Sequence, residues 1–277
     1  MVSVTEADFV DKPNSPADNF ARMRAGFIKG ALRRASAIPK LVFGVRGWTR
    51  LAADAMGRKR EPYTVQKRGG CSCELRGGAS DWWIFLEIFV FGIYQRVDAD
   101  ARQAQVVIDV GANVGLFAVY AASLNRNAEI HAFEPFPKNL AQLEKNLALN
   151  PGPRIKPHLA AVSDKSGTAT LYFTPGDDSG CSLSQTKGES CVVKTIGINE
   201  MFQHCGVTRC DLLKMDCEGS ELPIFEAASP ELLAKIGAVI MEYHNENEVA
   251  RLCEILTKAG FKTEVLSQIH TIYAGRS

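Results

Sequence analysis

A short run of residues, 106–115, carries the chemistry that is most readily read from this sequence. An apolar stretch ends at Asp109, glycines follow at Gly111 and Gly115, and an amphipathic pattern begins after them. We predict a β-strand, a tight turn and a helix N-terminus, which together present backbone N–H groups to a ligand at the carboxyl end of a parallel sheet. The next predicted strand ends in Glu134, 19 residues after Gly115 (134 − 115). An acid at about this separation from the glycine turn is suited to hold the two hydroxyls of a ribose.

The residues of this turn separate classes of ligand. A dinucleotide-binding turn needs glycine where this chain has Asn113 and Leu116, so the close approach of a pyrophosphate is not provided. A phosphate-binding P-loop is excluded because no Gly-Lys-Ser or Gly-Lys-Thr follows. S-adenosylmethionine carries a ribose and no pyrophosphate, and acids at Asp109 and Asp216 favour its cationic sulfonium and ammonium groups. The sequence therefore favours S-adenosylmethionine as the ligand.

Four side chains at predicted strand ends can take a proton from an acceptor. Asp216 and Glu218 follow one predicted strand, and Glu242 and His244 follow the next. The carboxyl ends of parallel strands share one edge of a sheet, so each can serve there as a general base. Asp216 can instead cap the next helix, Glu218 can be a first-turn acid favoured by the helix dipole, and His244 can be structural. We select Asp216, Glu218 and His244 as the catalytic candidates, and expect Lys214 to point into the sheet edge or to pair with an acid.

Histidines and cysteines give no clear metal-binding pattern. The remaining histidines form no ligand spacing; they are His131, His158, His204 and His270. The eight cysteines show no paired CxxC spacing, and no secretory signal precedes them, which is typical of a cytosolic protein. Cys71 with Cys73, and Cys205 with Cys210, can in principle ligate zinc, but their spacings are not those of the usual sites. We expect no bound metal, with a metal around Asp216 and Glu242 as the alternative.

Strand and helix patterns alternate from residue 105 onward. We predict strands at 106–110, 129–134, 156–161, 211–215, 238–243, 261–266 and 270–274, and helices at 115–125, 137–149, 219–227 and 247–259. This alternation predicts an α/β fold, with a mostly parallel seven-stranded sheet covered by helices on both faces. The last two strands lack an intervening helix and should form a hairpin at the sheet edge.

An insert and a preceding helix complete the predicted domain. The insert, residues 165–209, holds β-like pieces at 168–173 and 191–196 around a polar loop, 174–182, of a kind that often contacts substrate. Upstream of the first strand, residues 77–81 predict a turn with a helix N-cap, and Trp82 to Tyr94 predict a mostly buried helix. This helix is more typical of a core than of a binding platform, with a lid over the cofactor as the alternative role. It contains Glu87 and is too short to cross a bilayer.

The N-terminal part differs in charge from the rest of the chain. We divide the chain into a basic, partly helical arm, residues 1–65, and a catalytic domain, residues 66–277. From Asp18 to Arg60, eleven Lys or Arg stand against two acids (11 − 2 = +9), although the whole chain carries a net charge of +1. Helical spacing runs over residues 18–37, and Pro39 should end or kink that helix. Residues 18–60 either contact an anionic membrane or an acidic partner, or pack on their own domain. The imperfect amphipathicity of this segment favours packing on the domain. No nucleic-acid module is evident.

Five ordered motifs carry a family resemblance. They are Asp109-Val-Gly-Ala-Asn-Val-Gly115, Phe133-Glu-Pro135, Ala161-Val-Ser-Asp-Lys-Ser-Gly167, Leu213-Lys-Met-Asp-Cys-Glu-Gly219 with Glu221, and Met241-Glu-Tyr-His244. Together, over about residues 77–274, the chain resembles the FkbM-type family of S-adenosylmethionine-dependent methyltransferases. The resemblance implies the Rossmann-like sheet of class I methyltransferases and methyl transfer to a hydroxyl, often on a sugar or a glycosylated or polyketide product. It also implies that the methionine part of the cofactor is surrounded by Asp109, Gly111, Asn113 and Gly115, that Glu134 holds the ribose, and that the turn at Ser163 and Asp164 lies beside adenine.

These observations lead to one hypothesis and three alternatives. The hypothesis is an S-adenosylmethionine-dependent O-methyltransferase that acts on a sugar-containing, lipid-linked or polyketide-like metabolite. We expect it to be cytoplasmic, and peripheral at the membrane if the arm binds there. A metal-assisted O-methyltransferase and an N-methyltransferase would share the fold. The third alternative is a non-catalytic, membrane-associated scaffold with a vestigial cofactor site, against which the intact turn and the acid-rich strand ends argue.

Overall fold

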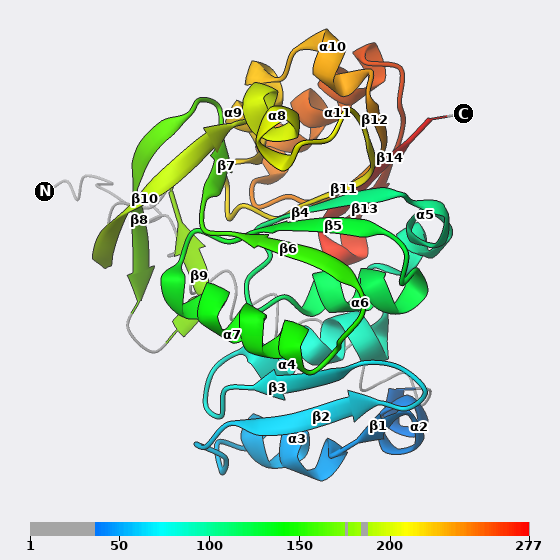
Figure 1. Cartoon of the computed structure of the whole chain (residues 1–277), viewed down its shortest axis with the longest axis vertical. Helices are drawn as coiled ribbons and strands as arrows, with labels where there is room; N and C mark the ends of the chain where they lie inside the picture. Colours follow the sequence, from blue (N-terminus) through cyan, green and yellow to red (C-terminus); the bar gives the residue numbers. More distant parts are fainter. Residues whose placement is uncertain (1–36, 175–176, 184–187, 277) are drawn as a thin grey trace, which may run out of the picture.

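The computed structural model describes residues 37–174, 177–183 and 188–276, and within them the strands form three sheets (Figure 1). The largest has seven strands in the order β13-β14-β12-β11-β4-β5-β6. Their bounds are β4 Val106–Val110, β5 Glu129–Phe133, β6 Arg154–His158, β11 Cys210–Met215, β12 Ile236–Glu242, β13 Lys262–Leu266 and β14 Thr271–Gly275. β14 is antiparallel to β12 and to β13, and all other neighbours are parallel. The predicted class I methyltransferase sheet and its edge hairpin are confirmed.

Helices cover both faces of this sheet because successive residues of the central strands point to opposite sides. Val107 and Leu212 belong to the core that includes residues of α6, and Ile108 and Leu213 belong to the core on the other face. The predicted helices form, with bounds α6 Leu116–Leu124, α7 Pro137–Ala148, α9 Glu221–Ala227 and α11 Val249–Lys258. Two short helices, α8 Met201–Cys205 and α10 Pro230–Leu233, join α9 and α11 in the second core.

The third predicted strand, 156–161, was wrong at its carboxyl end. β6 stops at His158, where the backbone N–H of Ala160 donates to the His158 carbonyl at 2.9 Å and turns the chain. Residues Ala161–Ser163 then form β7, which pairs with β10 in a separate sheet. Because the chain turns away at this point, the residues after β6 leave the large sheet and enter the separate one.

The insert folds as most of a four-stranded sheet in the order β7-β10-β8-β9. Its other strands are β8 Gly167–Thr174, β9 Asp177–Ser182 and β10 Glu189–Gly197, which confirms the two predicted β-like pieces. The prediction of a loop over 174–182 was wrong, because Asp177–Ser182 pairs with β8 as an antiparallel hairpin. Leu171 and Val193 of this sheet pack with Phe136 in a small core next to α7.

The described part of the N-terminal arm packs on the catalytic domain. Helices α2 Ala37–Gly44 and α3 Trp48–Ala55 flank a small antiparallel sheet of β1 Val45–Arg46, β2 Tyr63–Lys67 and β3 Ser72–Leu75. The backbone N–H of Glu74 donates to Asn146 Oδ1 of α7 at 2.7 Å, which fastens β3 to α7. Our division between residues 65 and 66 falls inside β2, and the predicted helix over 18–37 lies, apart from residue 37, outside the described residues. None of the helices in the described ranges combines the length and apolar character that a bilayer crossing requires.

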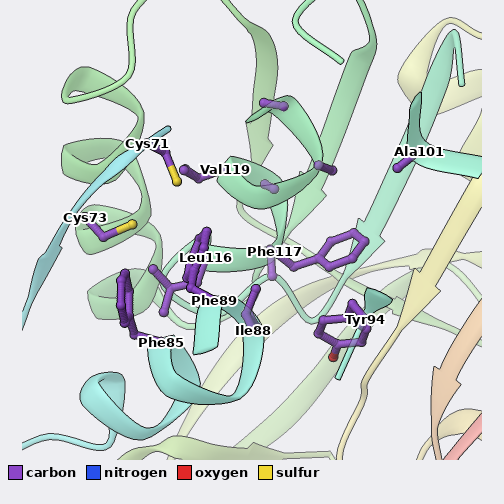
Figure 2. Packing of buried hydrophobic residues seen from close by; sticks show 14 of the residues in the cluster. Cys71, Cys73, Phe85, Ile88, Phe89, Tyr94, Ala101, Leu116, Phe117 and Val119 are labelled. Carbon is purple, nitrogen blue, oxygen red and sulfur yellow. The ribbon is translucent and has the colours of Figure 1, made fainter. Parts of the chain in front are cut away.

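The segment before β4 is buried but is not one continuous α-helix. After α4 Asp81–Leu86 the chain forms a π-helix, η1 Glu87–Phe91, and Gly92 ends it with φ of +71°. The predicted single helix from Trp82 to Tyr94 was therefore wrong in its second half, although the predicted burial is confirmed. Figure 2 shows Phe85, Ile88 and Phe89 packing beside residues of α6. This packing holds η1 next to the carboxyl ends of the central strands.

Candidate active site

The turn between β4 and α6 contains two glycines that the packing requires. Gly111 has φ of +72°, and a Cβ there would lie 1.8 Å from the carbonyl oxygen of Asp216. Gly115 has φ of +81°, and a Cβ there would lie 2.7 Å from Leu143 Cγ. Both conformations lie in the left-handed region that glycine adopts most readily. The two glycines therefore let the turn pack directly against the end of β11 and against α7.

Lys214 is buried beneath this turn between two acids. Asp109 and Lys214 are register partners on neighbouring strands, and Lys214 Nζ lies 3.2 Å from Asp109 Oδ1 and 3.7 Å from Asp216 Oδ2. The same Nζ donates to the carbonyl oxygen of Gly111 at 2.8 Å. Burial raises the pKa of Asp109, and Lys214 opposes that shift. Burial would lower the pKa of Lys214, but the carboxylates of Asp109 and Asp216 outweigh it and raise that pKa. Lys214 therefore pairs with acids and positions the turn.

Glu134 and Asn113 form a polar corner beside the turn. Glu134 is almost fully buried, and its carboxylate accepts hydrogen bonds from the backbone N–H groups of Asn113 and Phe136, each at 2.8 Å. Burial raises the pKa of Glu134 to about 7, against the effect of these N–H groups. Each carboxylate oxygen retains acceptor capacity for a ligand hydroxyl. Asn113 Oδ1 is buried without a hydrogen-bond partner among the described residues, so it is available to a donor on a ligand.

A pocket joins this corner to the ends of β5, β7 and β11. The pocket is open to solvent. Its walls include three groups of residues from distant parts of the chain, namely Gly111, Asn113 and Glu134; Leu171, Cys181 and Leu183 of the insert; and Asp216, Cys217 and Glu218. The insert thus supplies an apolar wall opposite the acidic end of β11.

The two predicted adenine contacts, Ser163 and Asp164, do not line the pocket, although the two residues before them do. Ala161 and Val162 of β7 are among the lining residues, whereas Ser163 and Asp164 are not. Ser163 Oγ donates to Asp164 Oδ1 at 2.9 Å, and Asp164 is exposed. Contact of Ser163 and Asp164 with adenine stays a prediction from the family resemblance.

The three catalytic candidates meet beside the pocket at a place we call the rim: Asp216 and Glu218 line the pocket, and His244, which does not, contacts both acids. His244 Nε2 lies 3.6 Å from Asp216 Oδ1 and 3.5 Å from Glu218 Oε2. Glu221 Oε1 lies 3.1 Å from His244 Nδ1, and the Glu221 side chain is 1% exposed. Its position in the sequence did not indicate this contact. The backbone N–H groups of Cys217 and Gly219 fix this carboxylate at 2.7 and 3.0 Å. Glu221 therefore orients the imidazole and leaves Nε2 facing the two rim acids.

Neighbouring groups raise the pKa values of His244 and Glu242. Burial opposes protonation of His244, but the hydrogen bond to Glu221 and the nearby Glu218 outweigh it and hold the imidazole pKa well above its ordinary value. Burial and the charge of Asp216 raise the pKa of Glu242 well above its ordinary range. Glu242 is therefore a poor base at neutral pH. Glu218 also has φ of +53°, a conformation that is uncommon outside glycine and that often marks a functional position.

Comparisons with known proteins identify the family of this chain. Residues 109–263, more than half of the chain, match the family described as the methyltransferase FkbM domain. The chain is 25% identical to the 31-O-demethyl-FK506 methyltransferase FkbM of Streptomyces tacrolimicus, over 70% of this chain and 85% of that protein. It is 29% identical to the hexuronic acid methyltransferase AglP of Haloferax volcanii, over 60% of this chain and 67% of that protein. It is also 24% identical to the AMB antimetabolite synthetase AmbE of Pseudomonas aeruginosa, over 66% of this chain but only 11% of that protein. The chain therefore belongs to the FkbM family of methyltransferases.

Proposed function

We propose that this methyltransferase transfers a methyl group from S-adenosylmethionine to a hydroxyl of a small sugar-containing or polyketide-like molecule. The observation that carries the proposal is that His244, held through Nδ1 by Glu221, places Nε2 within 3.6 Å of Asp216 and Glu218, two acids that line the same pocket as Glu134 and Asn113. Such a pocket can hold an adenosyl ligand at one end and a hydroxyl at the other. The names of two relatives, a hexuronic acid methyltransferase and a demethyl-FK506 methyltransferase, support the choice of acceptor class.

The residues of the pocket fit S-adenosylmethionine. The carboxylate of Glu134 can accept from the ribose hydroxyls, and Asn113 Oδ1, a buried oxygen without a partner in the described part of the chain, can accept from the ammonium group. Asp216 lines the pocket and offers a negative charge to the sulfonium. When bound, the cofactor supplies an electrophilic methyl group.

The remaining requirement is alignment and deprotonation of the acceptor hydroxyl. In its neutral form, His244 Nε2 can accept the hydroxyl proton as the oxygen attacks, and Glu221 stabilises the resulting imidazolium through Nδ1. Asp216 and Glu218 flank Nε2 and can orient the hydroxyl. Leu171 and Leu183 of the insert provide an apolar wall for the body of the acceptor.

Cofactor binding tests the proposal directly. We expect calorimetry to detect S-adenosylhomocysteine binding to the wild-type protein. Glu134→Gln should weaken that binding by roughly 10-fold to 100-fold, because a hydrogen bond to a charged group contributes about 1.5–3 kcal/mol. Glu144→Gln, an exposed change on α7, is the matched control and should bind normally. If the wild-type protein binds neither S-adenosylmethionine nor S-adenosylhomocysteine at millimolar concentration, the proposed cofactor is disproved.

The affinity should also depend on pH through Glu134. Its pKa is raised by burial to about 7, so the carboxylate is largely protonated at pH 6 and ionised at pH 8. Ribose hydroxyls donate better to the ionised form, so the affinity for S-adenosylhomocysteine should rise from pH 6 to pH 8 and then level off. In Glu134→Gln this rise should disappear. A wild-type affinity that is flat over the same range would contradict the role of this carboxylate.

A second candidate, metal-assisted O-methyl transfer, is favoured by one observation. Asp216, Glu218 and His244 each offer a ligand atom, and these atoms lie within 4.8 Å of one another. A divalent cation held there would bind and acidify the acceptor hydroxyl in place of a histidine base. Labelled methyl transfer into a panel of hydroxylated sugars and polyketides separates the two mechanisms. If His244 is the base, activity should survive prolonged chelation; loss with chelator and recovery with Mg²⁺ would establish the metal-assisted reaction.

A further inference from the structure

A second group of potential ligands, separate from Asp216, Glu218 and His244, lies behind Phe133, a residue that lines the pocket. It comprises His131 in the middle of β5, His158 at the end of β6, and Cys205 at the end of α8. One ring nitrogen of each histidine and the Cys205 sulfur lie within 4.8 Å of one another. His131 is fully buried and Cys205 is 8% exposed. Sequence spacing gave no sign of this group, because its members come from three separate elements.

The two imidazoles are held so that one nitrogen of each faces the other. His131 Nδ1 and His158 Nε2 lie 2.9 Å apart. The outward nitrogens have partners of their own, since His131 Nε2 lies 3.2 Å from Glu129 Oε1 and His158 Nδ1 lies 3.3 Å from His204 Nε2. Histidines that bind metals commonly have their second nitrogen fixed in this way by a carboxylate or another polar group. The inward pair is thus oriented as a metal requires.

The electrostatic surroundings disfavour a second proton on either imidazole. Burial lowers the pKa of His158 to about 4, assisted by the neighbouring histidines and by Lys156 and Lys194. Burial likewise lowers the pKa of His131. Neutral imidazoles are the form that binds a metal, and the nearby Cys205 adds a soft sulfur donor. Oxygen-seeking Mg²⁺ and Ca²⁺ do not match this donor set.

We propose that His131, His158 and Cys205 form a binding site for a borderline-soft divalent metal ion of the Zn²⁺ class. Binding displaces the thiol proton of Cys205 to solvent and moves the shared imidazole proton from His158 Nε2 to His158 Nδ1. His158 Nδ1–H then donates to His204 Nε2, with the proton of the neutral His204 ring on Nδ1. Three protein donors leave the fourth tetrahedral position to water. Because the His158 ring stacks on Phe133, a wall of the cofactor pocket, with centroids 4.5 Å apart, the ion would brace that wall.

Cobalt substitution tests the site without any methyl transfer, so its result is independent of the proposed reaction. The full chain, freed of metal under reducing conditions, is titrated with Co²⁺ and followed by absorption. We expect a thiolate-to-cobalt charge-transfer band in the near ultraviolet that saturates at one ion per chain and disappears on addition of Zn²⁺. Absence of this band at saturating Co²⁺ would overturn the proposal and leave a hydrogen-bonded histidine stack.

Matched variants identify the sulfur and the imidazoles. Cys205→Ser should abolish the charge-transfer band, whereas Cys253→Ser and Cys71→Ser should retain it. His158→Gln keeps all the sulfurs and should weaken Co²⁺ binding by at least about tenfold, which preserves the test if Cys205→Ser does not fold. His244→Gln should leave the band unchanged, because the acceptor rim contributes no sulfur. An unchanged band in Cys205→Ser, or unchanged affinity in His158→Gln, would disprove the site.

Discussion

Replacing Lys214 with methionine is expected to lower the free energy of unfolding by about 3–5 kcal/mol, the usual cost of removing one partner of a buried ion pair. Asp109 is fully buried, and Lys214 pairs with it, with Nζ 3.2 Å from Oδ1. Methionine matches the length of the lysine but provides neither a charge nor a donor for the carbonyl of Gly111. Urea unfolding followed by circular dichroism measures the loss as a lower midpoint with an unchanged slope.

The same variant has a predictable dependence on pH. Without Lys214, burial and the nearby Asp216 raise the pKa of Asp109 without the opposing effect of the lysine, so its folded-state pKa rises further above the unfolded value. The folded state then binds more protons than the unfolded state between these two pKa values, and stability falls as pH rises through that window. The penalty should therefore be smallest at acidic pH and largest at neutral pH.

Two further variants make this prediction specific. Lys262→Met removes an exposed lysine from the edge strand β13 and should change stability little. Adding Asp109→Asn to Lys214→Met removes the unpaired charge and should recover part of the lost stability, because the two sites are in contact and their effects are coupled. Wild-type stability in Lys214→Met would show that the ion pair does not hold the turn together.

The large sheet could be predicted because its central strands carry their own signal. Val106–Val110 and Ile236–Glu242 are nearly continuous apolar runs, as strands buried on both faces require. β6, with the sequence Arg154-Ile-Lys-Pro-His158, is a partly exposed edge strand and has no such run. Its end was misplaced because the turn there depends on a backbone contact between Ala160 and His158. The small N-terminal sheet was missed because its attachment depends on α7, far along the chain.

The candidate site could be predicted only where its residues lie at strand ends. Asp216 and His244 follow adjacent parallel strands, so sheet geometry alone brings them to one rim. Glu221 has the sequence signature of an ordinary first-turn acid, and its burial against His244 becomes visible only when α9 is placed. His131 and Cys205 gave no local spacing at all, since β5 and α8 meet only through tertiary packing. Sequence patterns therefore located the ligand end of the sheet but not the groups that orient its side chains.

Replacing His244 with glutamine is expected to lower turnover by about 10²–10⁴-fold, the usual contribution of a positioned general base. The affinity for S-adenosylhomocysteine should be unchanged, because the proposal assigns cofactor binding to Glu134 and Asn113, which line the pocket, and His244 does not line it. Turnover is measured as labelled methyl transfer to an acceptor hydroxyl, and cofactor affinity by calorimetry. His270→Asn is the control, since asparagine tolerates the left-handed backbone at that position (φ +48°) and His270 pairs with Glu246 instead of the rim acids. Equal turnover in His244→Gln and wild type would remove this residue from the mechanism.

The pH profile distinguishes a base from a group that merely fills space. Glu221 and Glu218 hold the pKa of His244 well above its ordinary value, so the imidazole is charged near neutrality and must lose its proton before it can act as a base. Wild-type turnover should therefore rise with pH, through an apparent pKa higher than that of an ordinary histidine. Glu221→Gln removes the carboxylate that stabilises the imidazolium, so it should shift this rise to lower pH while reducing the maximum, because Nε2 is less well oriented. A variant with reduced turnover but an unshifted profile would mean that Glu221 supports the fold of the rim and does not tune His244.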